Sequence, residues 1–146
     1  MKGGFEIVDH TADVGLRVWG KNWRELFEEA ARGMVSLIID LKTVRRKEEK
    51  TLSIQGENAE ELLLRWLREI LFLMEQGRMV FNEFQVEKDN FDRTFRDAYS
   101  FEGMLRGEKI DATRHGICTE IKAVTRHDLH VVKNDSWWEA SILFDV

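Results

Sequence analysis

The segment that follows Asn58 constrains the fold more than any other part of the chain. Its apolar residues recur with the period of an α-helix, and they are numerous enough to widen the apolar stripe beyond one face. We expect Asn58 to cap the start of this helix, with Glu61 in the reciprocal capping position, and Gly77 to stop it. The apolar residues are Leu62, Leu63, Leu64, Trp66, Leu67, Ile70, Leu71, Phe72, Leu73 and Met74. The pattern predicts a core helix that other elements cover on more than one side.

A second segment of helical period follows Asn22, which has the side chain of an N-cap residue, with Glu25 in the matching position. Its apolar residues are Trp23, Leu26, Phe27, Ala30, Ala31, Met34, Val35 and Ile38. Most of the remaining chain alternates with the period of two that is typical of strands. We expect strands at 14–18, 52–54, 79–88, 93–105, 117–132 (divided near His127 and Asp128) and 138–144.

These elements predict an α+β fold: a two-layer sandwich in which a mostly antiparallel sheet packs its apolar face on two main helices. A doubly wound parallel sheet would need more helices. A chain of 146 residues with 43% hydrophobic residues can bury one ordinary core. We therefore expect a single domain over residues 1–146.

Charge and cysteine content narrow the class of protein. The formal net charge of -5 argues against a strongly basic nucleic-acid clamp, and we interpret the run Arg45-Arg46-Lys47, which acidic residues follow, as a solvated loop. The single cysteine, Cys118, excludes an internal disulfide, so a cytoplasmic location is expected. Cys118 lies in an alternating stretch and is interpreted as a packed strand residue, not as a catalytic thiol.

Membrane and catalytic signals do not stand out in the sequence. Apolar runs stay well short of the roughly 20 residues that cross a bilayer, and the N-terminus lacks a signal-peptide pattern, so no membrane partner is expected. We find no Gly-rich phosphate loop, serine elbow or HExxH zinc motif. Trp19 and Trp137 fall on the opposite register from their apolar neighbours, which makes them candidates for a partner surface.

The end of the chain offers a candidate cation site. Asp145 and the terminal carboxylate of Val146 follow an alternating stretch directly, so both should lie at the end of a strand. Asp13 would add a third carboxylate, because hard divalent cations need several clustered oxygens. The alternative, that these carboxylates simply face solvent, stays open at this point. His10 also has two possible roles, as a metal ligand or as a hydrogen-bonded loop residue.

Several pieces of the sequence, in order along the whole chain, together resemble the archease family. They are Asp9-His10-Thr11-Ala12-Asp13-Val14-Gly15, Glu25-Leu26-Phe27-Glu28-Glu29-Ala30-Ala31, Glu61-Leu62-Leu63-Leu64-Arg65-Trp66-Leu67, Gly107-Glu108-Lys109-Ile110-Asp111 with His115, Glu120-Ile121-Lys122-Ala123-Val124-Thr125, and the closing Asp145-Val146. One departure is Arg126, where the family often carries an aromatic residue. It affects only a local contact.

The resemblance implies a protein cofactor and not a free-standing enzyme. Archeases assist a GTP-dependent RNA ligase of the RtcB type in tRNA splicing and RNA repair, and they promote its guanylylation and multiple turnover. The family's metal ligands correspond to Asp13, Asp145 and the terminal carboxylate of Val146, and its function-critical lysine corresponds to Lys122. The expected cofactor is a divalent cation, Ca²⁺ first and Mg²⁺ or Mn²⁺ as alternatives. The protein would contact RNA only indirectly, through the ligase.

Two other functions remain as alternatives. One is a metal-dependent phosphate-ester hydrolase with its own substrate pocket. It is disfavoured because the sequence offers no second carboxylate pair or general base beside the cation site. The other is a general chaperone or modulator of nucleic-acid-processing proteins, a role that has also been proposed for the family.

Overall fold

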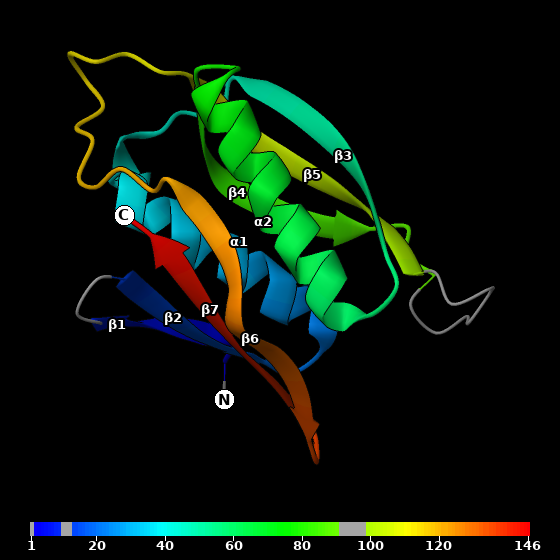
Figure 1. The fold of residues 1–146 in the computed structure, drawn as a ribbon. Helices are drawn as coiled ribbons and strands as arrows, with labels where there is room; N and C mark the ends of the chain where they lie inside the picture. Colours follow the sequence, from blue (N-terminus) through cyan, green and yellow to red (C-terminus); the bar gives the residue numbers. More distant parts are fainter. Residues whose placement is uncertain (1, 10–12, 91–98) are drawn as a thin grey trace.

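The fold places two helices between two antiparallel sheets (Figure 1), in a computed structural model that describes residues 2–9, 13–90 and 99–146. The elements are β1 (Gly4–Asp9), β2 (Asp13–Gly20), α1 (Trp23–Ile38), the 3-10 helix η1 (Leu41–Thr43), β3 (Glu48–Gly56), α2 (Ala59–Glu75), β4 (Met79–Glu87), β5 (Tyr99–Lys109), β6 (Ala123–Asn134) and β7 (Trp137–Asp145).

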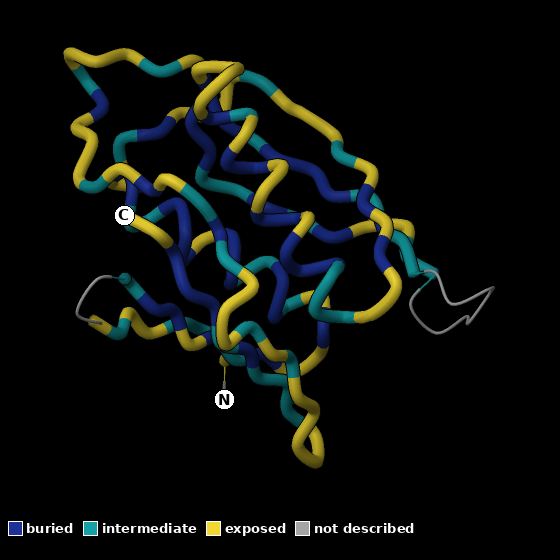
Figure 2. The backbone as a smooth tube through the Cα atoms, viewed as in Figure 1, coloured by how far each residue is buried: buried dark blue, intermediate teal, exposed yellow. Residues whose placement is uncertain are grey.

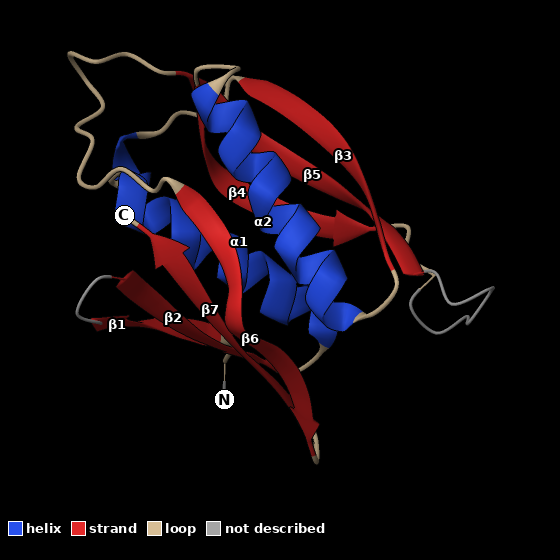
Figure 3. Ribbon diagram, viewed as in Figure 1, coloured by secondary structure: helices blue, strands red, loops and turns tan. Residues whose placement is uncertain are grey.

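The predicted α+β class is confirmed, and the structure adds a division of the sheet that the strand pattern did not predict. One sheet has the strand order β1-β2-β7-β6, and the other has the order β3-β5-β4. Both helices contact strands of both sheets, and Figure 3 shows them lying between the two layers of strands. This arrangement explains the wide apolar stripe of α2, because a helix between two sheets is covered on opposite sides.

Both predicted N-caps are present. The Asn22 side chain accepts a hydrogen bond from the backbone N–H of Glu25, and the Asn58 side chain accepts one from that of Glu61, each at 2.9 Å. The reciprocal half of the predicted capping differs. Glu25 reaches back to the backbone N–H of Lys21, whereas the carboxylate of Glu61 pairs with arginines.

Gly77 does not end α2 in the predicted manner. The residue in the left-handed region is Arg78, with a φ of 52°, and Gly77 has a negative φ. Glycine is required at position 77 for a different reason. An added Cβ there would come within 2.5 Å of the carbonyl oxygen of Leu73, so the last turn of α2 and the following turn can meet only at a residue without a side chain.

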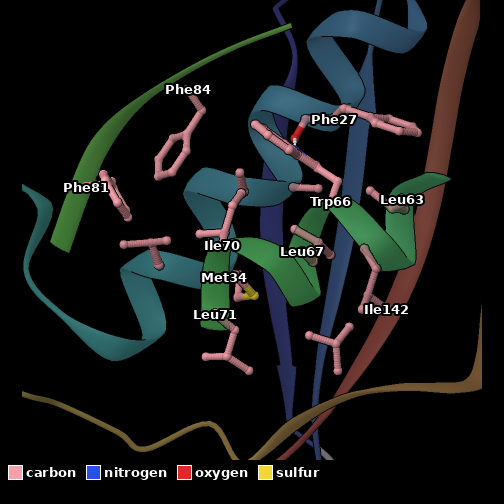
Figure 4. Packing of buried hydrophobic residues seen from close by; sticks show 14 of the residues in the cluster. Phe27, Met34, Leu63, Trp66, Leu67, Ile70, Leu71, Phe81, Phe84 and Ile142 are labelled. Atoms are coloured by element: carbon pink, nitrogen blue, oxygen red, sulfur yellow. Dashed lines mark hydrogen bonds between the residues drawn. The ribbon is translucent and has the colours of Figure 1, made fainter. Parts of the chain in front are cut away.

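The core lies around α2, as Figures 2 and 4 show. Trp66 is completely buried, and its indole N–H donates to the carbonyl of Phe27 at 3.0 Å, which satisfies the polar atom of the ring inside the core. Phe101 packs edge-on against Trp66 with ring centroids 5.4 Å apart. Gly103 of β5 faces the same ring, where an added Cβ would lie 2.1 Å from the indole. The predicted role of α2 as the core helix is confirmed.

Two predicted strands have different limits in the structure. Of the strand predicted at 93–105, the part before residue 99 lies outside the described residues, and β5 continues to Lys109. Residues 117–122 form no strand apart from a single bridge between Ile117 and Ile39. Cys118 is exposed, so its predicted packing in a strand is wrong. The division predicted near His127 and Asp128 is present only as a shift of register between Thr125 and His130, because β6 runs without a break from Ala123 to Asn134.

Within the described residues, we find no helix that is both long enough and apolar enough to span a bilayer.

Replacement of Trp66 by alanine should lower the free energy of unfolding by about 3–5 kcal/mol, because it leaves a cavity and an unpaired carbonyl in the core. Urea denaturation followed by circular dichroism would measure the change. Phe72→Ala on the same helix is the matched control, since Phe72 is 58% exposed, and it should change stability by no more than about 0.5 kcal/mol. Equal losses in the two variants would contradict the assigned core.

Candidate functional site

Asp13 and Asp145 lie directly opposite each other where β2 pairs with β7. Residues in register on adjacent antiparallel strands point to the same side of the sheet, with Cβ atoms about 5 Å apart. The alternation of each strand turns this pair away from the helices, since Leu16 and Phe144, which lie on the opposite face of their strands, belong to the core. Two carboxylates from opposite ends of the sequence therefore share one solvent-facing edge.

The paired carboxylates repel each other unless a positive charge compensates them. Like charges directly opposite on neighbouring strands destabilise a sheet, and neither Asp13 nor Asp145 forms an ion pair with another described residue. Asp13 is half-buried and Asp145 is exposed. The arrangement favours the binding of a cation, or of a partner that carries a positive charge, over an empty edge.

Lys122 reaches the same edge through its backbone. Its N–H donates to the carbonyl of Asp145 at 2.7 Å, one residue before Ala123 begins its pairing with Asp145. The Lys122 side chain is exposed. The strand predicted over 117–132 would place Lys122 on one face with Glu120 and Cys118, and this is wrong, because residues 118–122 are irregular. The structure nevertheless brings together the three predicted residues Asp13, Asp145 and Lys122.

An irregular segment, drawn from yellow to orange in Figure 1, joins β5 to β6 and contains Lys122. It is anchored at several points before Lys122. Near its middle, the backbone N–H of Cys118 donates to the carbonyl of Ile38 at 2.8 Å, next to the bridge between Ile117 and Ile39. Near its start, His115 is fully buried and contacts the buried Glu108. These contacts position the approach to Lys122 without regular secondary structure.

The Glu108 carboxylate is the centre of this anchor. It accepts hydrogen bonds from the Arg114 guanidinium at 2.6 Å and from the backbone N–H of Arg45 at 2.7 Å. His115 Nδ1 accepts from the backbone N–H of Asp111 at 2.9 Å, so its proton is on Nε2, which donates to Glu108 at 2.9 Å. The Arg114 hydrogen bond, together with the other donors, lowers the pKa of Glu108 from 4.5 to about 2 despite its burial.

The chemistry of the donor set fits a hard divalent cation but does not complete its coordination. Among residues 2–9, 13–90 and 99–146, no three His, Cys, Asp or Glu side chains are placed to hold a metal ion together. Two aspartates remain, with the exposed Val146 next in the chain. Carboxylate oxygens suit Ca²⁺, Mg²⁺ and Mn²⁺. His10 lies outside the described residues.

Sequence reasoning did not assign a role to Glu108 or Arg114, which hold the segment before Lys122. In the sequence, Glu108 stood out only as part of a segment that carries the family resemblance. An acidic residue in a strand pattern is normally solvent-exposed, so the pattern did not predict its burial. Its burial depends on Arg45, which is 63 residues earlier in the chain, and on Arg114 and His115 in the irregular segment that follows β5. No local periodicity could have indicated that contact.

The fold matches two solved structures over nearly the whole chain. The solution structure of Methanobacterium thermoautotrophicum protein 1598 superimposes with a TM-score of 0.82 at 30% identity, covering 98% of this chain and 99% of that one. The crystal structure of a Thermotoga maritima archease, described as a possible chaperone, gives a TM-score of 0.58 at 19% identity, covering 97% and 96%. The second shows the likeness of the fold alone.

The sequence comparisons identify the family. The family model described as "Archease protein family (MTH1598/TM1083)" matches residues 5–146. The protein archease of Methanosarcina barkeri is 37% identical over 142 residues, which make up 97% of this chain and 95% of that protein. The protein archease of Methanopyrus kandleri is also 37% identical, over 97% of this chain and 99% of its own length. The chain therefore belongs to the archease family.

The Glu108 network predicts a specific dependence of stability on pH. Because the pKa of Glu108 is about 2 in the folded chain and 4.5 ordinarily, its ionised form stabilises the fold above the ordinary value, and this contribution is lost as the pH falls through the folded value. Between about pH 5 and pH 3, Glu108→Gln should show a smaller loss of unfolding free energy than wild type in urea titrations.

Glu49→Gln is the matched control for this experiment, because Glu49 lies on a neighbouring strand with its side chain 55% exposed. It should keep the pH dependence of the wild type. If Glu108→Gln also keeps that dependence, Glu108 does not have the low pKa that its contacts give it.

Proposed function

We propose that this protein activates a GTP-dependent RNA ligase of the RtcB type, promoting its guanylylation and multiple turnover in the cytoplasm. The observation that carries the proposal is the register of β2 and β7, which places Asp13 opposite Asp145, with Lys122 hydrogen-bonded to the latter residue. Membership of the archease family supports the same conclusion. The activity belongs to the ligase, and this protein acts as its cofactor.

In this proposal the cation site is shared between the two proteins. Asp13, Asp145 and the carboxylate that Val146 carries at the end of this chain would hold a divalent cation, Ca²⁺ first and Mg²⁺ or Mn²⁺ as alternatives. Three carboxylates leave positions for water or for groups of the ligase. When bound, the cation would supply positive charge to phosphate oxygens. Lys122 would supply a second, mobile positive charge beside it.

Exposed apolar surface near this edge supports a protein partner. The α2 helix lies alongside β6, and the Arg68 guanidinium donates to the carbonyl of Val124. Phe72, one turn further along α2 towards Lys122, is 58% exposed. Ile117 is 60% exposed and lines an adjoining hollow of about 250 Å³ with Leu71 and other apolar residues. Apolar side chains exposed beside charged groups are typical of interaction surfaces.

The same exposed residues favour one second candidate, a general chaperone for nucleic-acid-processing proteins. The Thermotoga maritima structure is described as that of a possible chaperone, and exposed Phe72 and Ile117 could contact unfolded clients. A hydrolase is less favoured, because in the part of the chain that the structure describes no third acidic or histidine side chain joins the aspartate pair.

The cation site is tested by calorimetry. Wild type should bind Ca²⁺ or Mg²⁺, and Asp13→Asn should abolish binding because it removes one charged ligand and half of the carboxylate pair. Extension of the chain beyond Val146 should weaken binding, since an amide would replace the terminal carboxylate. Asp135→Asn, in the exposed turn between β6 and β7, is the control and should bind as wild type does. Unchanged binding by Asp13→Asn would remove Asp13 from the site.

The ligase function is tested by a ligation time course with an RtcB-type ligase, GTP and a divalent metal. A substoichiometric amount of this protein should convert single-turnover ligation into multiple turnover, and the protein alone should join no RNA. Lys122→Ala should return the reaction to a single turnover while keeping wild-type stability, because an exposed side chain is lost.

Lys50→Ala is the control, because Lys50 is exposed on β3 of the other sheet, and it should stimulate as wild type does. Stimulation by Lys122→Ala but not by Asp13→Asn would make the carboxylate pair the operative element. If neither variant differs from wild type, the proposal fails. Suppression of protein aggregation by both variants would then favour the chaperone, and turnover of phosphate esters without a ligase would favour the hydrolase.

A further inference from the structure

The solvent face of the four-stranded sheet carries a row of three hydrogen-bonding side chains in the middle of its strands. Arg17 on β2 lies opposite Ser141 on β7, and Ser141 lies opposite His130 on β6. All three are on the side of the sheet that faces away from the helices, as Asp145 is. Ser141 and Asp145 are four residue steps apart along β7, so the row lies about 13 Å from the carboxylate pair.

These three side chains can form further hydrogen bonds. Among the described residues, the Arg17 guanidinium and the Ser141 hydroxyl form no hydrogen bond or ion pair. His130 Nδ1 donates to the carbonyl of Asp128 at 3.2 Å, which leaves Nε2 directed elsewhere. Arginines of this chain commonly pair with carboxylates, as Arg114 does with Glu108. An unpaired guanidinium in register with a free hydroxyl is therefore a distinctive feature of this face.

A hollow of about 340 Å³ opens beside this row, on the side towards Asp13 and Asp145. Gly15 has no side chain to fill the space between Arg17 and the end of the strand. The lining residues include Val8, Gly15, Arg17, Asp128, His130 and Leu143. A smaller hollow of about 150 Å³ lies on the other side of the row, where Trp19 and Glu139 join Arg17 and His130. Polar groups at the rim of a partly apolar hollow are typical of a small-ligand site.

We propose that Arg17, Ser141 and His130 bind a phosphate group, carried by a nucleotide or by a single strand of RNA. A guanidinium presents a fork of donors that matches two oxygens of a phosphate. The Ser141 hydroxyl donates to a third oxygen, and His130 donates through Nε2 when both of its ring nitrogens carry a proton. This site lies apart from the carboxylate edge and needs no ligase.

Trp19 favours a nucleotide or RNA over free phosphate as the source. It follows Arg17 on the same face of β2, and its indole lies over Gly4 of β1, where an added Cβ would come within 3.0 Å of the ring. The ring N–H donates to the carbonyl of Lys2 at 3.2 Å, which holds the indole in place. A half-buried indole beside a phosphate-binding arginine provides a surface on which a base can stack.

Acidic residues on the same face would lower the affinity for phosphate. Their replacement is therefore a test in which binding should become stronger. Glu6 of β1 is in register opposite Arg17 and forms no ion pair with it in this structure, and Asp128 lines the larger hollow. Both carboxylates would repel a phosphate. Removal of the Glu6 charge should therefore strengthen binding, whereas a site that does not use Arg17 would not respond in this way.

The experiment is an NMR titration of the full-length ¹⁵N-labelled chain with inorganic phosphate, guanosine monophosphate and a short single-stranded oligouridylate, with a chelator present to exclude metal. Amide shifts should concentrate at Gly15–Trp19, His130 and Ser141–Leu143. Arg17→Gln should raise the Kd by about tenfold, and Glu6→Gln should lower it a few-fold. Arg106→Gln, a partly exposed strand arginine on the other sheet, should leave the Kd unchanged.

The three probes distinguish the sources of the phosphate. Tighter binding of the mononucleotide than of phosphate, with no further gain for the oligonucleotide, supports a nucleotide, whereas equal affinities for all three probes would contradict the role of Trp19 and leave a site for free phosphate. Tighter binding of the oligonucleotide, with additional shifts at Trp19, supports an RNA strand. The proposal is overturned if none of the probes shifts these residues, or if Arg17→Gln and Arg106→Gln weaken binding equally. Preserved amide spectra of the free variants will show that folding is intact.

Discussion

The antiparallel pairing of β2 with β7 determines both the core of the four-stranded sheet and the position of its charged edge. These two strands come from opposite ends of the sequence and pair from Asp13 opposite Asp145 to Gly20 opposite Trp138. Towards the helices, Leu16 and Ile142 face each other, and each is 1% exposed. A slip of one residue in either strand would exchange its core side chains with its solvent-facing ones. The burial of the apolar set therefore also specifies the register of the carboxylates.

The segment between β5 and β6 is ordered by a different interaction. Burial of a carboxylate is costly unless hydrogen bonds compensate it, and Glu108 receives them from Arg45, Arg114 and His115. Together these contacts tie the end of β5 to the chain before β3 and to the first part of the irregular segment. The route from Glu108 to Lys122 is thereby defined without a strand or helix. Here a network of charged side chains fixes the path of the backbone, as backbone hydrogen bonds between strands do elsewhere in the fold.

One face of the four-stranded sheet carries both negatively charged carboxylates and hydrogen-bond donors. The carboxylates of Asp13 and Asp145 lie at its end, and the donors of Arg17 and His130 lie along its middle. The opposite face packs on the helices, and its central positions, such as Leu16, Val18 and Ile142, are part of the core and have little freedom to vary. The solvent-facing register positions of β2, β6 and β7 are therefore where this fold can carry chemistry. The helices pack against the other side of these strands.

The sequence by itself determined the local elements of this protein. Helical periodicity and the caps Asn22 and Asn58 specify α1 and α2, because these signals act within a few residues. Period-two alternation likewise indicated most strands and the α+β class. Alternation failed for residues 117–122, since Ile117 and Ile121 occur at strand spacing but lie beside Ile39 and Leu71 outside a sheet.

Only the tertiary structure decided which strands pair and how they are divided between two sheets. Strand partners are selected by burial and register across distant parts of the chain, and no local pattern specifies them. The sequence offered Asp13 and Asp145 as candidate partners, but their alignment requires the full β2–β7 ladder. Glu108 is a second example, because the sequence pattern predicts an exposed charge, and its burial requires a donor from Arg45, which is distant in the chain, besides those of Arg114 and His115.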